Sequence, residues 1–369
     1  MLGLMENLKN LSMLCGASGD EGEVRGYIKE HAASLADEVF TDTMGNLYLH
    51  KKGPAGAPVV AICAHMDEVG LLIYKILENG ELKYDYAGID PRVMPGRRVQ
   101  IGRNKVRGVV GSKAIHLQTD DEFEHSFKHK ELTIDIGAKD KADAEKYVEV
   151  GDYAVFDTEF IELGEGFVSG KALDDRVGCA ILMELLKDSY DCDFYAVFTV
   201  QEECGLRGAS VVAENVHPDM ALILEGTTAN DMPDVKGHQC VTRVGHGPAL
   251  TFMDRGVMVR PPMLDALRSA AKEAGVPYQL RQGTNGGTDI DMIHKAVGGC
   301  VGGGISVPCR YIHSASSVAS KADIEAALRA FTNGKTVEIV LPIPVGASAN
   351  KRPRFFAIAY VYFAKSLCP

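Results

Sequence analysis

Two spacings of apolar residues recur along the chain. Helical spacing predicts helices over residues 5–14 and 176–188. Apolar runs that end at charged or imidazole side chains predict buried strands over residues 59–64, 194–200 and 221–224. Strands that alternate with helices are typical of a parallel sheet with helices on both faces. The pattern therefore predicts an α/β domain.

Residues 71–159 follow a different pattern. Short segments such as "LLIYKIL", "RRVQIG" and "VRGVVGS" alternate apolar and polar residues, and turn residues separate them. This alternation is typical of a small all-β module. Because helical periodicity resumes after the module, we expect it to be an insertion within the α/β domain.

Residues 342–369 form a tail of unusual composition. They contain four basic residues and no acidic residue, and the ten residues "FFAIAYVYFA" are uncharged and mostly apolar. An added terminal strand, an interface segment or a stretch foreign to the native chain would each explain this composition.

Composition narrows the class of protein. The formal net charge of −11 favours solubility and argues against nucleic acid or an anionic membrane as the main partner. Nine cysteines are scattered without a C-x-x-C pair, which is typical of reduced thiols in the cytoplasm. The N-terminus carries Glu6 and no long apolar block, so we expect neither a secretory signal nor a membrane-spanning segment.

Acidic and imidazole side chains gather where the predicted strands end. The carboxyl ends of parallel strands meet at one edge of a sheet, and this is where such folds bind ligands. Two further acids precede a predicted helix in "GKALDDRVG", and a histidine follows a glycine-rich stretch in "RYIHS". The residues concerned are His65, Asp67, Asp174, Asp175, Glu202, Glu203, Glu225 and His313.

Each of these features alone has a simpler interpretation. A lone His-x-Asp is usually a surface pair, and acids before a helix usually cap its N-terminus. Paired glutamates after a strand usually lie in a solvated turn. Independent surface features need not all fall at strand ends, however, so the combination indicates one shared site.

The chemistry of such a site follows from its donor atoms. Adjacent carboxylates repel one another, burial raises the pKa of any that lacks compensation, and a divalent cation reverses that balance. Two imidazoles and three carboxylates suit two ions such as Zn²⁺, Co²⁺ or Mn²⁺. Two ions about 3.5–4 Å apart can share a water and lower its pKa toward 7. A carboxylate outside the ligand set can then move protons.

The ordered motifs "AHMDEVG", "ALDDRVG", "QEECGLRGA", "LILEGTTAND" and "YIHS" resemble those of metallopeptidase family 42, the glutamyl and TET-type aminopeptidases. The resemblance implies a phosphorylase/hydrolase-like α/β catalytic domain, with helices on both faces of a mixed sheet, formed by residues 1–67 and 163–341. Residues 68–162 would then form an inserted, PDZ-like small β-barrel that serves dimerisation.

The resemblance also implies roles for single residues. Glu202 would be the general base and acid, and Asp67 would fix His65 by a hydrogen bond. Asp174 is preferred over Asp175 as the ligand shared by both ions, because it begins the "D-x-[KR]-x-G" run of the wider superfamily. Glu225 stands where the family more often has aspartate, and it reaches further. The implied metal ligands are His65, Asp174, Glu203, Glu225 and His313.

The implied reaction is hydrolysis of the N-terminal peptide bond of peptides through a metal-bridging water that Glu202 activates. The implied assembly is a homo-oligomer, from a dimer to a tetrahedral dodecamer. The segment "RQGTNGGTDIDM" is either a turn, since glycine permits positive φ, or a wall of the substrate pocket contributed by Thr288 and Asp289.

Three other functions stay open at this point. A dimetal amidohydrolase or deacylase would act on N-acyl amino acids. A metal-free glycosidase would need two carboxyls about 5–5.5 Å or about 6.5–9.5 Å apart. A catalytically inactive assembly protein is the third, although all five implied ligands are present. Tests of aminoacyl amides against acylated amino acids, with and without a chelator, would separate these activities.

Overall fold

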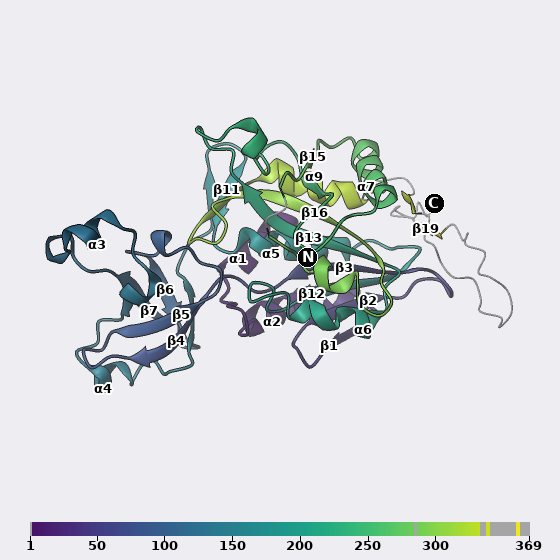
Figure 1. Cartoon of the computed structure of the whole chain (residues 1–369). Helices are drawn as coiled ribbons and strands as arrows, with labels where there is room; N and C mark the ends of the chain where they lie inside the picture. Colours follow the sequence, from purple (N-terminus) through teal and green to yellow (C-terminus); the bar gives the residue numbers. More distant parts are fainter. Residues whose placement is uncertain (1, 284–285, 333–336, 340–358, 362–369) are drawn as a thin grey trace.

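The computed structural model of the chain describes residues 2–283, 286–332, 337–339 and 359–361. Figure 1 shows two lobes, a larger one in which helices pack on a broad sheet and a smaller one of short strands. Each lobe has its own core of buried apolar side chains. The structure confirms the predicted α/β fold with a small β-barrel.

A mixed sheet runs through the larger lobe. Its four central strands are parallel and lie in the order β12, β3, β13, β16. β2 lies antiparallel beside β12, and β17 lies antiparallel beside β16. The strands of this sheet are β1 (Glu38–Thr41), β2 (Leu47–Lys51), β3 (Val59–His65), β10 (Ile161–Leu163), β11 (Phe167–Gly170), β12 (Asp193–Thr199), β13 (Met220–Ala229), β14 (Ala249–Thr251), β15 (Gln279–Leu280), β16 (Val301–Arg310) and β17 (Ser317–Ser320).

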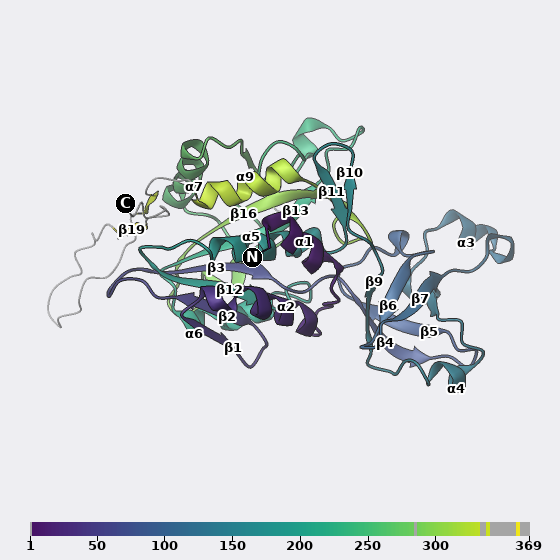
Figure 2. The ribbon, with the colours of Figure 1, turned by 180° about the vertical axis from the view of Figure 1, so that it is seen from behind.

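Helices cover both faces of this sheet. Figures 1 and 2 show α1, α2, α5, α7 and α9 on one face and α6 on the other, and Lys51 of β2 donates hydrogen bonds to the backbone oxygens of both Leu35, after α2, and Leu186, after α5. α5 is the most buried, because it packs on β3 and β13 and is covered in turn by α1 and α9. The helices of this lobe are α1 (Leu4–Met13), α2 (Gly22–Ala32), α5 (Leu173–Leu185), α6 (Val212–Val216), α7 (Pro261–Glu273), α8 (Ile290–Ile293) and α9 (Lys321–Thr332).

The smaller lobe is a closed barrel in the strand order β4-β5-β8-β7-β6-β9. Alternate side chains of its strands point inward, as in β4, where Leu71 and Ile73 are buried and a bulge after Ile73 makes Ile76 the next buried residue. The barrel strands are β4 (Leu71–Ile76), β5 (Leu82–Tyr86), β6 (Arg98–Ile101), β7 (Val106–Gly111), β8 (Thr133–Asp135) and β9 (Tyr153–Phe156), and α3 (Asp120–Glu124) and α4 (Lys141–Ala144) lie in its loops.

One predicted boundary was wrong. β13 pairs with β16 along its whole length, so the strand continues to Ala229 and Glu225 lies within it rather than after it. Asp174 and Asp175 fall within the bounds of α5, but neither has helical φ and ψ, so the regular helix begins after them, as predicted.

The tail predicted over residues 342–369 lies mostly outside the described residues. Its described part is β19 (Ala359–Val361), which pairs antiparallel with β18 (Val337–Ile339). Within the described ranges, no helix has both the length and the apolar character needed to cross a bilayer. The cysteines described are all free thiols.

Candidate metal centre

The candidate site lies at the carboxyl ends of the central parallel strands. β3 ends at His65, which pairs in register with Thr199, the last residue of β12. The chain beyond β12 turns at once into Glu202 and Glu203, while β13 on the other side of β3 carries Glu225. The sheet order therefore brings together acids that are far apart in the sequence.

His65 is the innermost residue of the site, with 1% of its surface exposed. Its Nε2 atom lies 3.0 Å from Glu225 Oε1 and 3.3 Å from Asp174 Oδ1. On the other side of the ring, Nδ1 lies 3.1 Å from the backbone oxygen of Asp67 and 3.4 Å from its Oδ1. A ring that donates from Nδ1 leaves Nε2 free to bind a metal ion among the carboxylates.

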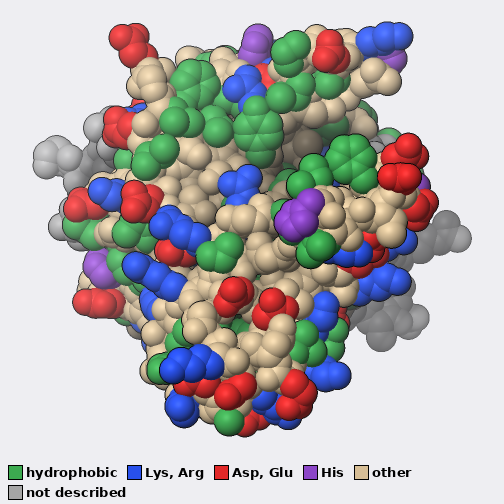
Figure 3. All heavy atoms as spheres, turned by 90° about the vertical axis from the view of Figure 1, so that its left-hand side faces the viewer, with side chains coloured by type: hydrophobic (Ala, Val, Ile, Leu, Met, Phe, Trp, Pro, Cys, Tyr) green, Lys and Arg blue, Asp and Glu red, His purple; other side chains and the backbone are tan. Residues whose placement is uncertain are grey.

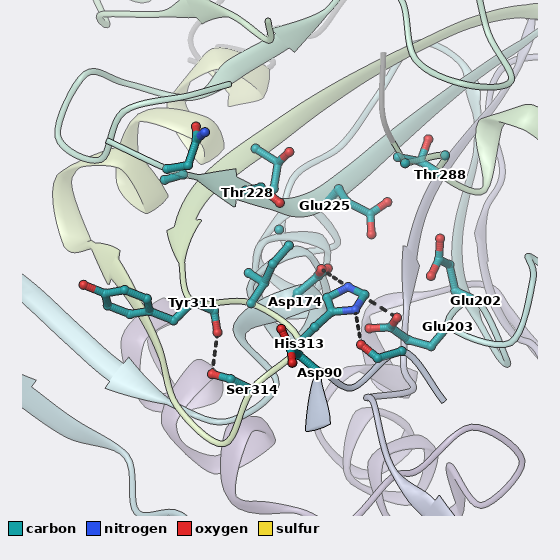
Figure 4. Close-up of a pocket in the computed structure, with 18 of the residues that line it drawn as sticks. Asp90, Asp174, Glu202, Glu203, Glu225, Thr228, Thr288, Tyr311, His313 and Ser314 are labelled. Atoms are coloured by element: carbon teal, nitrogen blue, oxygen red, sulfur yellow. Dashed lines mark hydrogen bonds and ion pairs between the residues drawn. The ribbon is translucent and has the colours of Figure 1, made fainter. Parts of the chain in front are cut away.

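His313 is the counterpart of His65 on the outer side of the site. Its Nε2 atom lies 3.5 Å from Glu203 Oε2 and 3.8 Å from Asp174 Oδ2. Its Nδ1 atom lies 2.7 Å from the carbonyl oxygen of Gly88, a residue of the smaller lobe. Figure 4 shows the ring of His313 between Asp174 and Glu203. Nε2 of this histidine is therefore also free to bind a metal ion.

Asp174 lies between the two histidines and faces both. Its Oδ1 atom approaches His65 and its Oδ2 atom approaches His313. The possible ligand atoms form three groups, and within each group the atoms lie within 4.8 Å of one another. Two groups share Asp174, one with His65 and Glu225 and one with His313 and Glu203, and the third joins His65, Glu202 and Glu203. A carboxylate common to two groups fits a pair of ions.

The neighbouring Asp175 has a different environment, since it is fully buried and accepts hydrogen bonds from backbone groups. Its Oδ2 atom accepts from the backbone N–H of His65 at 3.1 Å, and its Oδ1 atom accepts from that of Gly178 at 2.9 Å. Asp175 therefore holds β3 against the start of α5. These placements favour Asp174 over Asp175 as the shared ligand.

The acids of the site are buried together, which raises their pKa values. Burial raises the pKa of Glu203 to about 7 and that of Glu225 to about 8. Burial also raises the pKa of Glu202 well above its usual range. Glu225 Oε2 has no hydrogen-bond partner within the described part of the chain. Carboxylates in this state fit a divalent cation, which would satisfy the lone pairs and offset the charge.

Asp67 organises the loop that carries the two glutamates. Its carboxylate accepts hydrogen bonds from the backbone N–H groups of Glu202 at 2.9 Å and Glu203 at 3.2 Å. It also accepts one from the hydroxyl of Ser18 at 2.6 Å. The sequence suggested a contact of Asp67 with His65 alone, and the loop contacts had no signal there because they involve backbone groups.

A cavity of about 1300 Å³ opens in front of the candidate metal ligands. Glu202 and Thr288 both line it. Asp289, the other residue suggested for its wall, is not among the lining residues, since it is 1% exposed and its carboxylate accepts a hydrogen bond from Thr199. The smaller lobe contributes Gly88, Asp90, Val93 and Arg97 to the rim, which sequence patterns did not indicate.

Comparisons with known proteins find relatives over most of the chain. The sequence model described as M42 glutamyl aminopeptidase matches residues 45–329. The glutamyl aminopeptidase of Lactococcus lactis subsp. cremoris is 30% identical over 328 residues, which cover 85% of this chain and 91% of that protein.

Solved structures give the same result for the fold. An aminopeptidase of the archaeon Desulfurococcus kamchatkensis superposes with a TM-score of 0.85 at 37% identity, covering 89% of this chain and 94% of that one. The TET1 peptidase of Pyrococcus horikoshii, which can assemble into a tetrahedron or a large octahedral shell, has a TM-score of 0.78 at 31% identity, covering 89% of this chain and 97% of that one.

Proposed function

The chain belongs to the M42 glutamyl aminopeptidase family and is an aminopeptidase, and from this premise we propose that it removes N-terminal residues from peptides at a centre of two divalent ions. Zn²⁺, Co²⁺ or Mn²⁺ suit the mixed imidazole and carboxylate donors. The observation that carries the proposal is the position of Asp174, whose two oxygens face different histidines. The residues that would hold the ions are His65, Asp174, Glu203, Glu225 and His313.

Ions bound there would supply Lewis-acid polarisation of the scissile carbonyl and a water acidified toward neutral pH. The chain's own residues do the rest. Glu202 lines the cavity beside the ligands, and its Oε2 atom lies 4.0 Å from His65 Nε2. We assign it the general base that takes a proton from the attacking water and the acid that returns the proton to the leaving amine.

Asp67 has a positioning role in this proposal. It holds the backbone of Glu202 and Glu203 and faces Nδ1 of His65. The carboxylate of Asp67 thus contacts the proposed base, Glu202, and one ligand from each group, His65 and Glu203, and holds the three residues relative to one another. Thr288 would contact the substrate from the cavity wall, whereas Asp289 would support the wall from beneath.

The test is a metal titration. Protein stripped with a chelator is supplied with Zn²⁺, Co²⁺ or Mn²⁺ and assayed on leucyl, glutamyl and lysyl anilides and on N-acetylated amino acids. Anilide hydrolysis that returns as two ions bind per chain supports the proposal. Cleavage of the acetylated substrates alone would favour a deacylase, and full activity in the stripped protein would contradict a metal centre.

We propose further that residues 68–162, the barrel lobe, form the assembly domain of a homo-oligomer, and that residues 1–67 and 163–341 form the catalytic domain. Figure 3 views the molecule from the barrel end, and hydrophobic side chains lie among charged ones in the upper half of that view. Ile115, Leu117 and Phe123, between β7 and β8, are 68%, 61% and 64% exposed. Such side chains are typical of protein interfaces. Light scattering of an Ile115→Ser, Phe123→Ser double variant should show a smaller oligomer than the parent protein.

A further inference from the structure

A turn of the smaller lobe contacts the candidate metal centre directly. Gly88 follows β5 of the barrel, yet its carbonyl oxygen accepts a hydrogen bond from His313 Nδ1 at 2.7 Å. The two residues are 225 positions apart in the sequence. A carbonyl at this position fixes both the tautomer and the orientation of a metal-binding imidazole. The barrel therefore completes the surroundings of His313.

Gly88 has a backbone conformation that this contact requires. Its φ is +67°, which glycine adopts without strain. A Cβ atom at this position would lie 3.0 Å from His313 Nδ1 and 3.3 Å from Glu203 Oε2. Glycine thus allows the turn to approach two candidate ligands at once.

His129 holds the same turn from inside the barrel lobe. It lies in the 3-10 helix η4 (His129–Glu131) and is 8% exposed. Its Nε2 atom lies 2.8 Å from the carbonyl oxygen of Ile89, the residue after Gly88. Its ring stacks on Tyr86, with ring centroids 3.5 Å apart, and its Nδ1 atom lies 3.3 Å from the hydroxyl of Tyr84. One histidine therefore contacts the turn on both sides of Gly88.

We infer that His129 is a positioning residue for the outer metal site. Residues 86–89 form a strap that His129 holds in place, and the strap presents the Gly88 carbonyl to His313. This inference rests on the proposed metal centre. It means that the barrel lobe has a part in metal binding besides any part in assembly, because the outer ligand group depends on it. Within the described residues, the hydrogen bonds and ion pairs of His65 and Glu225 all go to residues outside the strap, so these two ligands should not depend on it.

The variants that test this inference are His129→Ala, His129→Gln and the control His125→Ala. Glutamine keeps an N–H donor for the Ile89 carbonyl. His125 is an exposed histidine of the same lobe, and its contacts are with the nearby Asp121. The first measurement is calorimetric titration of the chelator-stripped proteins with Co²⁺. We expect His129→Ala to weaken one of two binding steps by about 10–100-fold and to leave the other unchanged. His129→Gln should recover most of the loss, and His125→Ala should resemble the parent.

The second measurement needs no metal. Nitrogen NMR of the stripped protein, with His313 assigned by a His313→Ala spectrum, should show Nδ1 protonated in the parent and a tautomer mixture in His129→Ala. Should His129→Ala not fold, Gly88→Ala disturbs the same contact from the turn itself and should give both results.

Two results would overturn the inference. One is a folded His129→Ala protein with two unchanged binding steps. The other is an equal weakening of both steps, which a structural role alone would produce. A parent protein that binds no pair of ions would instead contradict the proposed function. The tautomer measurement would still test whether His129 orients His313 through the strap.

Discussion

The two histidines of the candidate centre occupy very different parts of the molecule. His65 ends a central strand, is 1% exposed and has hydrogen-bond partners from the core of the larger lobe. His313 lies in the turn between β16 and β17 with φ of +59°, and 38% of its side chain is exposed. Its ring is held by a carbonyl of the other lobe. The inner half of the centre, which contains His65, is thus positioned by the register of the sheet. The outer half, which contains His313, is positioned by the contact between the two lobes.

Buried charges make the inner half more rigid still. Arg176 is fully buried in α5 and donates a hydrogen bond to the backbone oxygen of Met66 at 3.0 Å, next to His65. The same guanidinium contacts Glu68, which also pairs with the buried Lys171. Buried pairs of this kind are costly to break. The chain from His65 to Glu68 is therefore tied to the helix behind it, and no such support lies behind His313 in the described part of the turn.

The largest effect should come from Glu202, which lies in neither of the two ligand groups that contain Asp174 but forms a third group with His65 and Glu203. Glu202→Gln should lower kcat by about 10²–10⁴-fold, the usual contribution of general acid–base catalysis, since glutamine cannot carry the proton. Both ions should stay bound, as measured by elemental analysis. Glu203→Gln is the matched control and should lose metal. Loss of metal in Glu202→Gln would make Glu202 a ligand of the inner half.

Alanine substitutions of the two histidines test the comparison itself. His65→Ala and His313→Ala should each weaken the binding of one ion. The loss should exceed the factor of about 10–100 that is expected for a residue that only orients a metal ligand. The free energies of unfolding of the two metal-free variants should differ. His65→Ala leaves buried acids unpaired and should cost about 1–3 kcal/mol, whereas His313→Ala should change stability by about 0.5 kcal/mol or less. Equal losses in the free energy of unfolding, measured in urea, would refute the distinction between an inner half that the sheet holds and an outer half that depends on the other lobe.

The same distinction separates what the sequence could predict from what it could not. His65 ends one strand and the two glutamates follow another, and both strands have apolar runs that are plain in the sequence, so their convergence follows from the parallel order. The extent of β13 past Glu225 depends on pairing with β16, which no local pattern encodes. Asp174 and Asp175 differ only in what they face in three dimensions. The approach of Gly88 to His313 depends on the packing of two lobes, and the glycine in "YAGID" gave no hint of it.

An intermediate effect is expected for Asp67, which contacts both halves. Asp67→Asn keeps the size of the side chain but places an amide beside the backbone N–H groups of Glu202 and Glu203, where one of its two ends repels them. Activity should fall by about 10–100-fold, as for other partners that orient metal ligands. Titration with Co²⁺ should show both binding steps weakened, in contrast to His129→Ala. A change in a single step would place Asp67 in one half only.

The smallest effect should come from Ser18, which donates a hydrogen bond to Asp67 Oδ2 from the turn between α1 and α2. Ser18 is partly exposed, so water can replace its hydroxyl in Ser18→Ala, and Asp67 keeps both backbone donors. The expected loss is about 0.5–1 kcal/mol, or about 2–5-fold in kcat/KM. Metal affinity should not change, because neither glutamate loses its bond to Asp67. A loss as large as that of Asp67→Asn would show that the N-terminal turn fixes the loop of the two glutamates.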